Sequence, residues 1–484
     1  MKGTVEMKVY PMLLDGELVD KGKAFSVYDP SNGNVVGEAI EAEKSQVEEA
    51  VEAAKKALYS WSDLSIQERA KALLSASDII EANKEELSKL YTLEQGKPIS
   101  DARIEVSRVI DYFRSYAEMA PLIREELANV TETAISYFSW MPVGVVGIII
   151  PWNSPLVLGA IKAPPALLAG NTIILKPPSY VPLSWLKIAE LIKDIFPPGV
   201  FNIITGSGSN VGETIVAHPD VAMISFTGDS ETGKRIMEAA SPTLKKLTLE
   251  LGGNDPAIFL HDAPLDDEHL NRIINACFRN AGQLCMAVKR IYVEHSIMDE
   301  FLKWFVEGVK KIKVGPGLKD SVDMGPLNNK PQLEFVEELV EEARGSGAKI
   351  LIGGSRPEGE DFKKGFFYLP TVIYTENESL KIVYEEQFGP VVPVIPFDNE
   401  EDAIKKANNT RYGLGGSVWS KNIGKALSLA KKIESGVTWV NGHSVRYLGP
   451  MACYGGVKDS GLGREKGIYG LQEYLERKTI SLIL

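Results

Sequence analysis

The sequence is poor in the residues that build disulfide frameworks and metal sites. It holds only 3 cysteines and 5 histidines in 484 residues. Cys277, Cys285 and Cys453 are odd in number and match no zinc-ligand spacing. We therefore expect neither a disulfide framework nor a metal site, and three free thiols fit a reducing cytoplasm best.

The chain also lacks a long apolar run and an excess of positive charge. Its most apolar stretch, residues 143–151, is shorter than the roughly 20 apolar residues that span a bilayer. Residues 1–6 lack the apolar core of a signal peptide. The formal net charge of −12 argues against nucleic acids and anionic membranes as general partners. We expect a soluble, cytoplasmic protein with no nucleic-acid or membrane partner.

The residues that are present describe an ordinary globular protein with more than one domain. Apolar residues make up 44% of the chain and charged residues 24%, which is typical of soluble proteins. A length of 484 residues is too great for one hydrophobic core. Two or three domains are therefore expected.

Apolar spacing predicts the elements of a first domain. Residues 11–19 have the composition of a hairpin that turns at Asp-Gly, and residues 99–120 have helical spacing. The continuous apolar run 143–150 is typical of a strand buried on both faces. Further strand candidates lie at 172–175, 200–204 and 223–226, with helical stretches between them. This alternation predicts a parallel α/β sheet.

A second strand–helix series begins near Asp255. It contains strand candidates at 257–260, 290–293 and 349–352 and helix candidates at 268–280, 298–313 and 330–345. Residues 134–140 also have strand composition. The fold class is therefore α/β with two open sheets.

Cys285 is the most informative residue. It lies in the small, polar segment 280–285 after an amphipathic run, so it is expected to face a cleft rather than a core. A thiolate is a strong nucleophile, which makes Cys285 a candidate for covalent catalysis.

Two polar features follow strands of the first sheet, where α/β sheets bind their ligands. Asn153, in residues 151–155, has an amide that could donate to a developing oxyanion, although an Asn between prolines also forms turns. Lys176 and Ser179 could bind a hydroxyl or phosphate, and the alternative for Lys176 is a solvated surface position.

Two glycine-containing segments are candidates for phosphate binding. Residues 206–212 resemble the dinucleotide fingerprint but contain one residue too many. Residues 226–233 have the pattern of a strand, a turn and a helix start, whose N–H groups could meet a pyrophosphate. Plain loop glycines would explain either segment alone.

Glu250 is a carboxylate in an apolar strand, which is costly unless it is paired, protonated or functional. Burial would raise its pKa toward neutrality and suit it as a general base acting on water. The alternative is a structural glutamate in an ion pair with a lysine.

Taken together, these segments resemble the aldehyde dehydrogenase superfamily along nearly the whole chain. The resemblance is carried, in family order, by residues 151–155, 176–179, 226–233, 250–253, 282–285, 386–390 and 455–465. It implies two Rossmann-like open-sheet domains and a small β oligomerisation arm. The implied parts are a cofactor-binding domain (1–123 and 143–252), a catalytic domain (253–447), an arm (124–142 and 467–484) and a return segment (448–466).

The resemblance implies a covalent mechanism. Cys285 attacks the aldehyde carbonyl, and the Asn153 amide and the Cys285 N–H hold the oxyanion of the thiohemiacetal. Hydride transfer to the nicotinamide leaves a thioester, and Glu250 activates the water that releases the acid. The pKa of Cys285 must then fall from about 8.5 to give enough thiolate.

The resemblance also implies a set of cofactor-binding residues: Trp152, Lys176, Ser179, Gly212, Phe226, Thr227, Gly228, Asp229, Gly233, Leu251, Gly252, Glu386 and Phe388. Strongly NAD-selective members carry a glutamate where this chain has Ser179, and a hydroxyl does not repel a 2′-phosphate. We expect the cofactor to be NADP or NAD, with NADP accepted. Asp229 replaces a common serine and is expected to point away or to cap the following helix.

Substrate residues are implied at Ser154, Leu284 and Met286. With Leu284 where an arginine would mark phosphorylated substrates, a medium-sized uncharged aldehyde is expected. Arg446 and His443 leave open a carboxylated aldehyde such as a semialdehyde. Coenzyme A-acylating and catalytically silent relatives are further alternatives, and the intact Glu250 argues against both.

By resemblance, the arm and the terminal strand 477–484 pair with a neighbouring subunit. The apolar tail 480–484 agrees, because an exposed strand edge invites pairing. A homo-oligomer, either a dimer or a tetramer, is expected.

Overall fold

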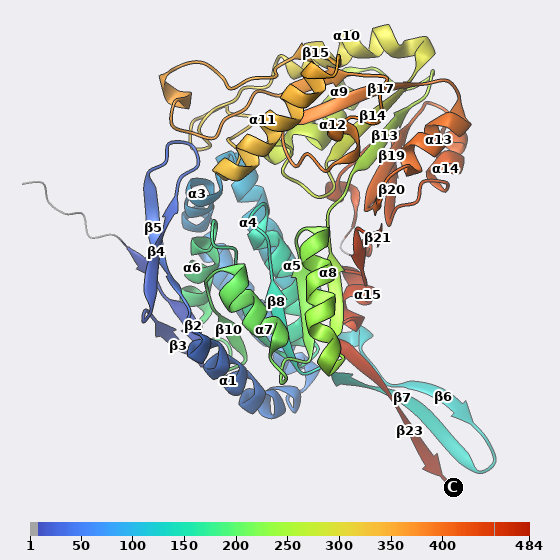
Figure 1. Ribbon diagram of the computed structural model, residues 1–484. Coiled ribbons are helices and arrows are strands. Elements are labelled where there is room, and N and C mark those ends of the chain that lie inside the picture. The colour runs from blue at the N-terminus through green and yellow to red at the C-terminus, as the bar shows by residue number, and fades with distance from the viewer. Residues whose placement is uncertain (1–7, 450) are drawn as a thin grey trace, which may run out of the picture.

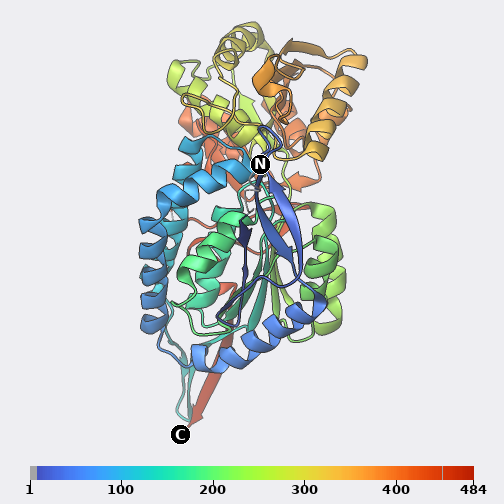
Figure 2. The ribbon, with the colours of Figure 1, turned by 90° about the vertical axis from the view of Figure 1, so that its left-hand side faces the viewer.

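The computed structural model describes residues 8–449 and 451–484. The expectation about residues 1–6 lies outside the described residues. Two α/β lobes are stacked on each other, and an arm projects from the lower lobe (Figure 1). The C-terminus lies at the tip of this arm (Figure 2). None of the described helices has the length and apolarity needed to cross a membrane.

The lower lobe is built on an eight-stranded sheet. Its strands, in spatial order, are β22 (Gly461–Leu462), β12 (Lys246–Glu250), β11 (Met223–Thr227), β8 (Val145–Ile149), β9 (Thr172–Lys176), β10 (Phe201–Ile203), β2 (Met12–Leu14) and β3 (Glu17–Val19). The five central strands run parallel, whereas β22, β2 and β3 are antiparallel to their neighbours. The hairpin β2–β3 turns at Asp15 and Gly16, both with positive φ, as the Asp-Gly pair predicts.

Helices cover both faces of this sheet. They are α1 (Lys44–Ser62), α2 (Ile66–Ala82), α3 (Lys84–Gln95), α4 (Ile99–Glu118), α5 (Pro155–Leu168), α6 (Leu183–Ile192), α7 (Glu213–Ala217), α8 (Ser230–Ala240) and α15 (Gly467–Gln472). A small sheet of β1 (Val9–Tyr10), β5 (Val35–Glu41) and β4 (Lys23–Tyr28) lies beside them. Because helices bury both faces, the central strands are apolar throughout, as at β8.

The strand order places a ligand crevice at β8 and β11. From β8 the chain moves outward through β9 to β10, and it then returns to the other side of β8 as β11 and β12. Ligands of open α/β sheets bind beyond the carboxyl ends of the strands at such a reversal. The loop after β8 carries Trp152 and Asn153, and the loop after β11 carries Gly228.

The upper lobe is a second α/β domain with a seven-stranded sheet. Its strands, in spatial order, are β15 (Lys349–Ile352), β16 (Thr371–Tyr374), β17 (Val391–Phe397), β14 (Val288–Glu294), β13 (Asp255–Phe259), β19 (Gly415–Trp419) and β20 (Val437–Val440). Only β15 is antiparallel to its neighbour. The helices are α9 (Asp267–Phe278), α10 (Met298–Val309), α11 (Lys330–Gly345), α12 (Lys381–Tyr384), α13 (Glu400–Asn408) and α14 (Ile423–Ala430).

The segment after β20 joins the two lobes again. β21 (Val457–Lys458) pairs with β18 (Tyr412–Gly413) of the upper lobe, and β22 then pairs with β12 of the lower lobe. Residues 467–472 form α15 against the lower lobe, so the terminal strand of the arm begins only at Leu475.

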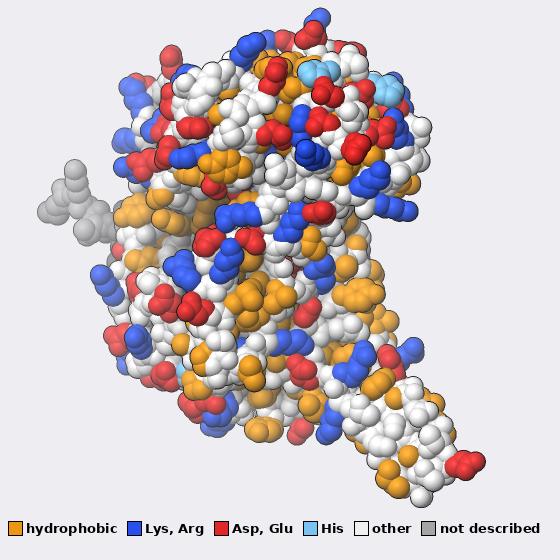
Figure 3. Space-filling model, turned by 45° about the vertical axis from the view of Figure 1, so that its right-hand side comes forward, with side chains coloured by type: hydrophobic (Ala, Val, Ile, Leu, Met, Phe, Trp, Pro, Cys, Tyr) orange, Lys and Arg blue, Asp and Glu red, His pale blue; other side chains and the backbone are white. Residues whose placement is uncertain are grey.

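The arm is a three-stranded antiparallel sheet. It consists of β23 (Leu475–Ile483), β7 (Ala134–Pro142) and β6 (Glu126–Val130). The arm stands away from the body of the molecule and shows apolar side chains on its surface (Figure 3). Arg477 lies over the rings of Phe138 and Trp140 and orders the base of the sheet.

Two predicted helices end earlier than their apolar spacing indicates. The helix expected at 268–280 ends at Phe278, because Asn280 and Ala281 adopt left-handed backbone conformations. The helix expected at 298–313 ends at Val309. The early end of the first helix determines where the loop that carries Cys285 begins.

Candidate active site

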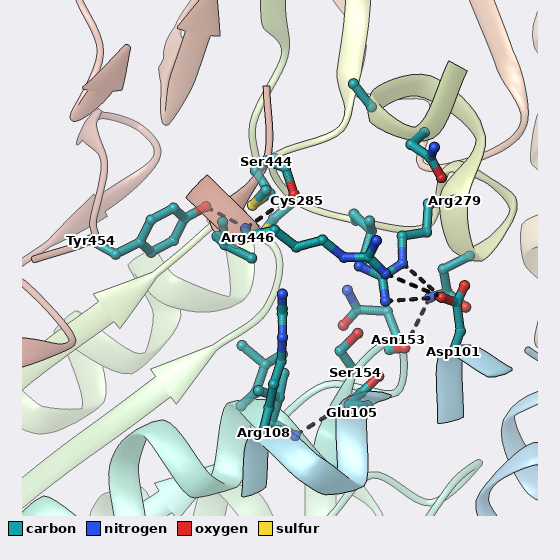
Figure 4. Close-up of a pocket in the computed structure, with 18 of the residues that line it drawn as sticks. Asp101, Glu105, Arg108, Asn153, Ser154, Arg279, Cys285, Ser444, Arg446 and Tyr454 are labelled. Atoms are coloured by element: carbon teal, nitrogen blue, oxygen red, sulfur yellow. Dashed lines mark hydrogen bonds and ion pairs between the residues drawn. The ribbon is translucent and has the colours of Figure 1, made fainter. Parts of the chain in front are cut away.

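A cavity with a volume of about 430 Å³ lies at the switch point, between the two lobes. Cys285, Asn153 and Glu250 all line it, although they come from three separate segments of the chain. Figure 4 shows Cys285 and Asn153 at this cavity together with charged side chains from α4 and from the loop after β20. The three residues singled out from the sequence therefore share one space.

The loop that carries Cys285 has an unusual backbone. Asn280, Ala281 and Gly282 have φ values of 53°, 55° and 71° in succession. A side chain at Gly282 would collide with the carbonyl of Gly389, so only glycine fits. Gln283 fixes the loop from behind, because its Oε1 accepts from the Asn328 N–H at 2.9 Å. The sulfur is thereby presented to the cavity on a loop with little freedom.

Lys289 holds the same loop through its side chain. Its Nζ donates to the carbonyls of Cys285 at 2.6 Å and Leu284 at 2.9 Å, and it lies 3.3 Å from a carboxylate oxygen of Glu386. Glu386 in turn accepts from the Gly253 N–H at 3.0 Å. The buried ammonium of Lys289 thus links the loop that carries Cys285 to Glu386, a residue of the predicted cofactor site.

The thiol of Cys285 is less acidic than the sequence interpretation required. Burial raises its pKa to about 11, and this outweighs the lowering by the charge of Lys289 and by the hydroxyl of Tyr454, 3.8 Å from the sulfur. The expected fall in the pKa is therefore wrong for this structure. A neighbouring base must take the proton if the thiol is to react near neutral pH.

Asn153 presents its amide at the position expected for an oxyanion donor. Its Nδ2 donates to the Gln283 carbonyl at 2.9 Å, next to the nucleophile, and its buried Oδ1 has no hydrogen-bond partner among the described residues. The main-chain N–H of Cys285 likewise has no acceptor in the part of the chain that the structure describes. An asparagine that only formed a turn would not need the hydrogen bond from Nδ2 to the Gln283 carbonyl.

Glu250 is the last residue of β12 and is only 4% exposed. Burial raises its pKa to about 8, the direction predicted from the sequence, while the charges of Lys162 and Arg464 act against this rise. Its Oε1 has no hydrogen-bond partner among the described residues. The alternative of a structural ion pair is not favoured, because Lys162 pairs with Glu465.

The predicted substrate residues Ser154, Leu284 and Met286 also line the cavity. Arg446 and His443 line it as well, but only Arg446 is free to meet a ligand. The ring of His443 is held by Ser417 at 3.0 Å, by the Met286 carbonyl at 3.0 Å and by Asp255 at 3.3 Å. The expectation that His443 holds a carboxylate is therefore wrong.

Sequence reasoning missed five cations of the cavity wall: Arg108, Arg279 and Lys466, and also Lys97 and Arg272, which pair with Glu105 and Glu268. Arg279 lies 3.0 Å from Asp101, which also lies 3.7 Å from Arg446. Figure 4 shows Arg446 extending across the cavity toward this pair, with Arg108 rising from α4.

The side chains of Arg108 and Lys466 make no hydrogen bond or ion pair with any described residue. The sequence carried a signal for Arg108, because Glu105, Arg108 and Tyr112 share one face of the predicted helix 99–120. Lys466 gave no such signal.

A second surface next to the cavity fits a dinucleotide. Lys176 is almost fully buried at the end of β9, and the only hydrogen bond from its Nζ to a described residue is a 3.3 Å contact to the Pro177 carbonyl. Burial lowers its pKa to about 8, partly offset by Glu41. A buried ammonium with so little solvation needs an acceptor from a ligand. Gly212 lies beside its side chain, and Ser179 donates to the Gly206 carbonyl at 2.9 Å.

The turn after β11 departs from one expectation. The Gly228 N–H donates to the Glu250 carbonyl at 3.1 Å, so it is not available to a pyrophosphate as predicted. Asp229 caps α8 and accepts from the Thr232 N–H at 2.8 Å, which is the capping role foreseen. Thr227, buried beside Phe226 at the end of β11, has a hydroxyl without a partner among the described residues.

Most of the remaining predicted cofactor residues lie in contact with one another. Gly233 packs against Leu251, and Glu386 approaches Gly252 so closely that a side chain there would collide with its carboxylate. The rings of Trp152 and Phe388 pack edge to face with centroids 5.4 Å apart. A buried lysine, an orphaned hydroxyl and an aromatic wall together fit a nicotinamide dinucleotide.

Comparison with known proteins agrees with this geometry. The model of the aldehyde dehydrogenase family matches residues 18–480. The chain is 40% identical to 2-aminomuconic semialdehyde dehydrogenase of Mus musculus, over 100% of both chains. It is 39% identical to betaine aldehyde dehydrogenase of Bacillus subtilis, over 97% of this chain and 96% of that relative.

A solved structure agrees as well. Betaine aldehyde dehydrogenase of Staphylococcus aureus in complex with NAD+ superposes with a TM-score of 0.94 at 37% identity, covering 98% of this chain and 95% of that one. The chain belongs to the aldehyde dehydrogenase family and is an NAD(P)-dependent oxidoreductase that acts on aldehydes.

Proposed function

We propose that the protein oxidises a carboxylated aldehyde, a semialdehyde, to the corresponding dicarboxylic acid. The observation that carries this proposal is the charge of the substrate cavity. Arg108 and Lys466 have no anionic partner among the described residues, and Arg446 shares Asp101 with Arg279. Partly buried cations without counter-ions are stabilised by a bound anion, and arginine binds a carboxylate in a bidentate fashion.

Other ionic groups of the wall cancel each other. Lys97 pairs with Glu105, and Arg272 pairs with Glu268. The remaining positive charge favours the semialdehyde alternative over the uncharged aldehyde expected from the sequence. It also disfavours a cationic aldehyde, although some relatives are named for betaine aldehyde. A relative named for 2-aminomuconic semialdehyde fits the charge better.

The chemistry follows from the groups around Cys285. The sulfur adds to the aldehyde carbon, and the oxyanion accepts from the Asn153 Nδ2 and from the Cys285 N–H, which has no other acceptor among the described residues. Donors aimed at a developing oxyanion contribute on the order of 10²–10³ in rate each.

Glu250 supplies the base at both proton transfers. Its pKa of about 8 lies below the pKa of about 11 of the Cys285 thiol, so its carboxylate is the stronger candidate to be ionised near neutral pH. Glu250 must release the thiol proton to solvent before the second transfer. After oxidation, the regenerated carboxylate takes a proton from the water that attacks the thioester, and the Cys285 thiolate is the leaving group. A buried base next to the acyl group supports water as the acceptor rather than coenzyme A.

NAD(P)+ would be held by Lys176, Thr227, Glu386 and Phe388, and when bound it supplies the hydride acceptor. Ser179 lies near Lys176 and carries no charge that would repel a 2′-phosphate. We therefore expect NADP+ to be used with an efficiency at least comparable to NAD+. Measured kcat/KM values with a strong preference for NAD+ would contradict this expectation.

The proposed substrate class is tested with two four-carbon aldehydes that differ only in charge. We expect kcat/KM for 4-oxobutanoate to exceed that for butanal about 100-fold, because each charged hydrogen bond is worth about 1.5–3 kcal/mol. Arg446→Met and Arg108→Met should each lower the value for 4-oxobutanoate about tenfold and leave butanal nearly unchanged.

Arg103→Met is the matched control for these variants. Arg103 lies on α4 like Arg108, but it is exposed and pairs with Glu85. It should change neither substrate's kinetics. Equal efficiency for the two aldehydes in the parent protein would overturn the proposal.

A further inference from the structure

Lys466 is a largely buried cation whose side chain has no hydrogen-bond acceptor and no counter-ion among the described residues. It is 3% exposed and lines the substrate cavity, and its side chain makes no hydrogen bond or ion pair with any described residue. Its neighbour Glu465 is already paired with Lys162. The Nζ of Lys466 has no acceptor among the described residues, so its three donors are available to a group that enters the cavity.

The backbone at Lys466 supports the same conclusion. Its φ and ψ values are 66° and 156°, a region that glycine occupies almost alone. Strained conformations of this kind persist where the surrounding structure holds a side chain in place, and they cluster at ligand sites. A glycine would adopt this backbone without strain, so the lysine is held there at a cost in free energy.

Lys466 and Arg446 occupy different depths of the cavity. The Arg446 side chain is 40% exposed, at the mouth, whereas Lys466 is buried in the wall. Burial and then the charge of Arg108 lower the pKa of Lys466 to about 8, partly offset by Cys453. With the carboxylate assigned to Arg446 and Arg108, Lys466 is left to meet another part of the substrate in the same cavity.

We propose that Lys466 is a specificity-determining residue that selects semialdehydes carrying a further oxygen acceptor, a hydroxyl or oxo group, between the aldehyde carbon and the carboxylate. An ammonium has three donors and no acceptor, so it accepts an oxygen at this position and repels an amine that is protonated. The inference rests on the proposed function, because it needs the carboxylate at the mouth of the cavity.

The test compares substituted and unsubstituted four-carbon semialdehydes. The substrates are 4-oxobutanoate, its 2-hydroxy and 3-hydroxy derivatives, and its 2-amino derivative. In the parent protein we expect kcat/KM for at least one hydroxylated derivative to exceed that for 4-oxobutanoate about tenfold or more, and the 2-amino derivative to be the poorest substrate.

Three variants distinguish a role of Lys466 in substrate recognition from a role in the stability of the fold. Lys466→Met should reduce the hydroxyl preference, the ratio of kcat/KM for the hydroxylated derivative to that for 4-oxobutanoate, to about one, whereas Lys466→Arg should retain part of the preference. Lys466→Gly should lose the preference without a lower Tm, because glycine adopts this backbone without strain. A purely structural lysine would instead lower Tm and leave the preference intact in the folded variant.

The outcomes also distinguish this inference from the proposed function. If no hydroxylated derivative exceeds 4-oxobutanoate, or if Lys466→Met keeps the preference, the inference is wrong while the advantage of 4-oxobutanoate over butanal can still hold. If butanal equals 4-oxobutanoate, the proposed function itself fails.

Discussion

At the scale of single residues, the buried carboxylate of Glu250 determines how activity depends on pH. Its ionised form is the base, and burial raises its pKa to about 8. The rate of hydrolysis should therefore rise with pH through a limb near pH 8. Glu250→Gln should lower kcat by on the order of 10²–10⁴ and remove this limb. The measurement is kcat between pH 6 and 10.

Glu94→Gln is the control for this pH profile. Glu94 is also buried, but it accepts from the N–H groups of Leu183 and Ser184 and does not line the cavity. Its variant should keep the limb even if it is less stable. A limb near pH 8 that survives in Glu250→Gln would place the base elsewhere.

Lys289 provides a second prediction at this scale. Its charge lowers the pKa of the Cys285 thiol, against the effect of burial. Lys289→Met should raise that pKa by on the order of one unit, so alkylation of Cys285 by iodoacetamide at pH 8 should slow about tenfold. Lys289→Arg keeps the charge and should react nearly as the parent does. An unchanged rate in Lys289→Met would show that the charge does not act on the sulfur.

How far the site can be predicted depends on the kind of residue. Cys285, Asn153 and Glu250 stand in short local motifs, so the sequence indicated them and the structure places them at one cavity. Arg108 and Lys466 stand in no motif. Their function depends on which helix face packs toward the cavity and on a backbone conformation that no local pattern indicates for a lysine.

At the scale of elements, the loop between α9 and β14 has the strictest requirement. A Cβ at position 282 would collide with Gly389, and an alanine there would have to adopt the φ of 71° that Gly282 has. Gly282→Ala should therefore lower Tm and kcat together, because the loop must move to accommodate it.

Gly345→Ala is the matched control. Gly345 is the last residue of α11, and nothing lies within 4 Å of a Cβ built there. We expect the same Tm or a slight rise, since alanine favours helix over glycine by about 1 kcal/mol. If Gly282→Ala behaves like Gly345→Ala, the loop is more adaptable than its geometry indicates.

The same loop shows where apolar periodicity stops predicting elements. The strands were found because buried parallel strands are continuous apolar runs, as at β8 and β11. The end of α9 was missed because the apolar spacing continues while Asn280 and Ala281 turn left-handed. The stop depends on contacts with Gly389 and Asn328, which are distant in sequence.

At the scale of the whole molecule, the arm indicates an assembly of subunits. Leu482 and Ile483 of β23 are 56% and 73% exposed, and Leu127 of β6 is 69% exposed. An exposed apolar sheet of this kind favours pairing with another subunit. We expect light scattering to give the mass of a dimer or tetramer.

Charged residues on the terminal strand should lower this mass. Leu482→Glu with Ile483→Glu should shift the protein toward smaller species, whereas Tyr59→Glu, on a side chain of α1 that is 77% exposed, should not. A monomeric mass for the parent protein would contradict the expected assembly.

The central claim is that Cys285 forms an acyl-enzyme which Glu250 opens with water. Mass spectrometry of Glu250→Gln mixed with 4-oxobutanoate and NADP+ tests it most directly. Acylation should be slower than in the parent protein, because the variant also lacks the base for the Cys285 thiol. We predict that NADPH rises slowly to one equivalent per subunit and then stops, with the acyl mass on the peptide that contains Cys285. Continued turnover in this variant, or an acyl group on Cys453 in place of Cys285, would contradict the account.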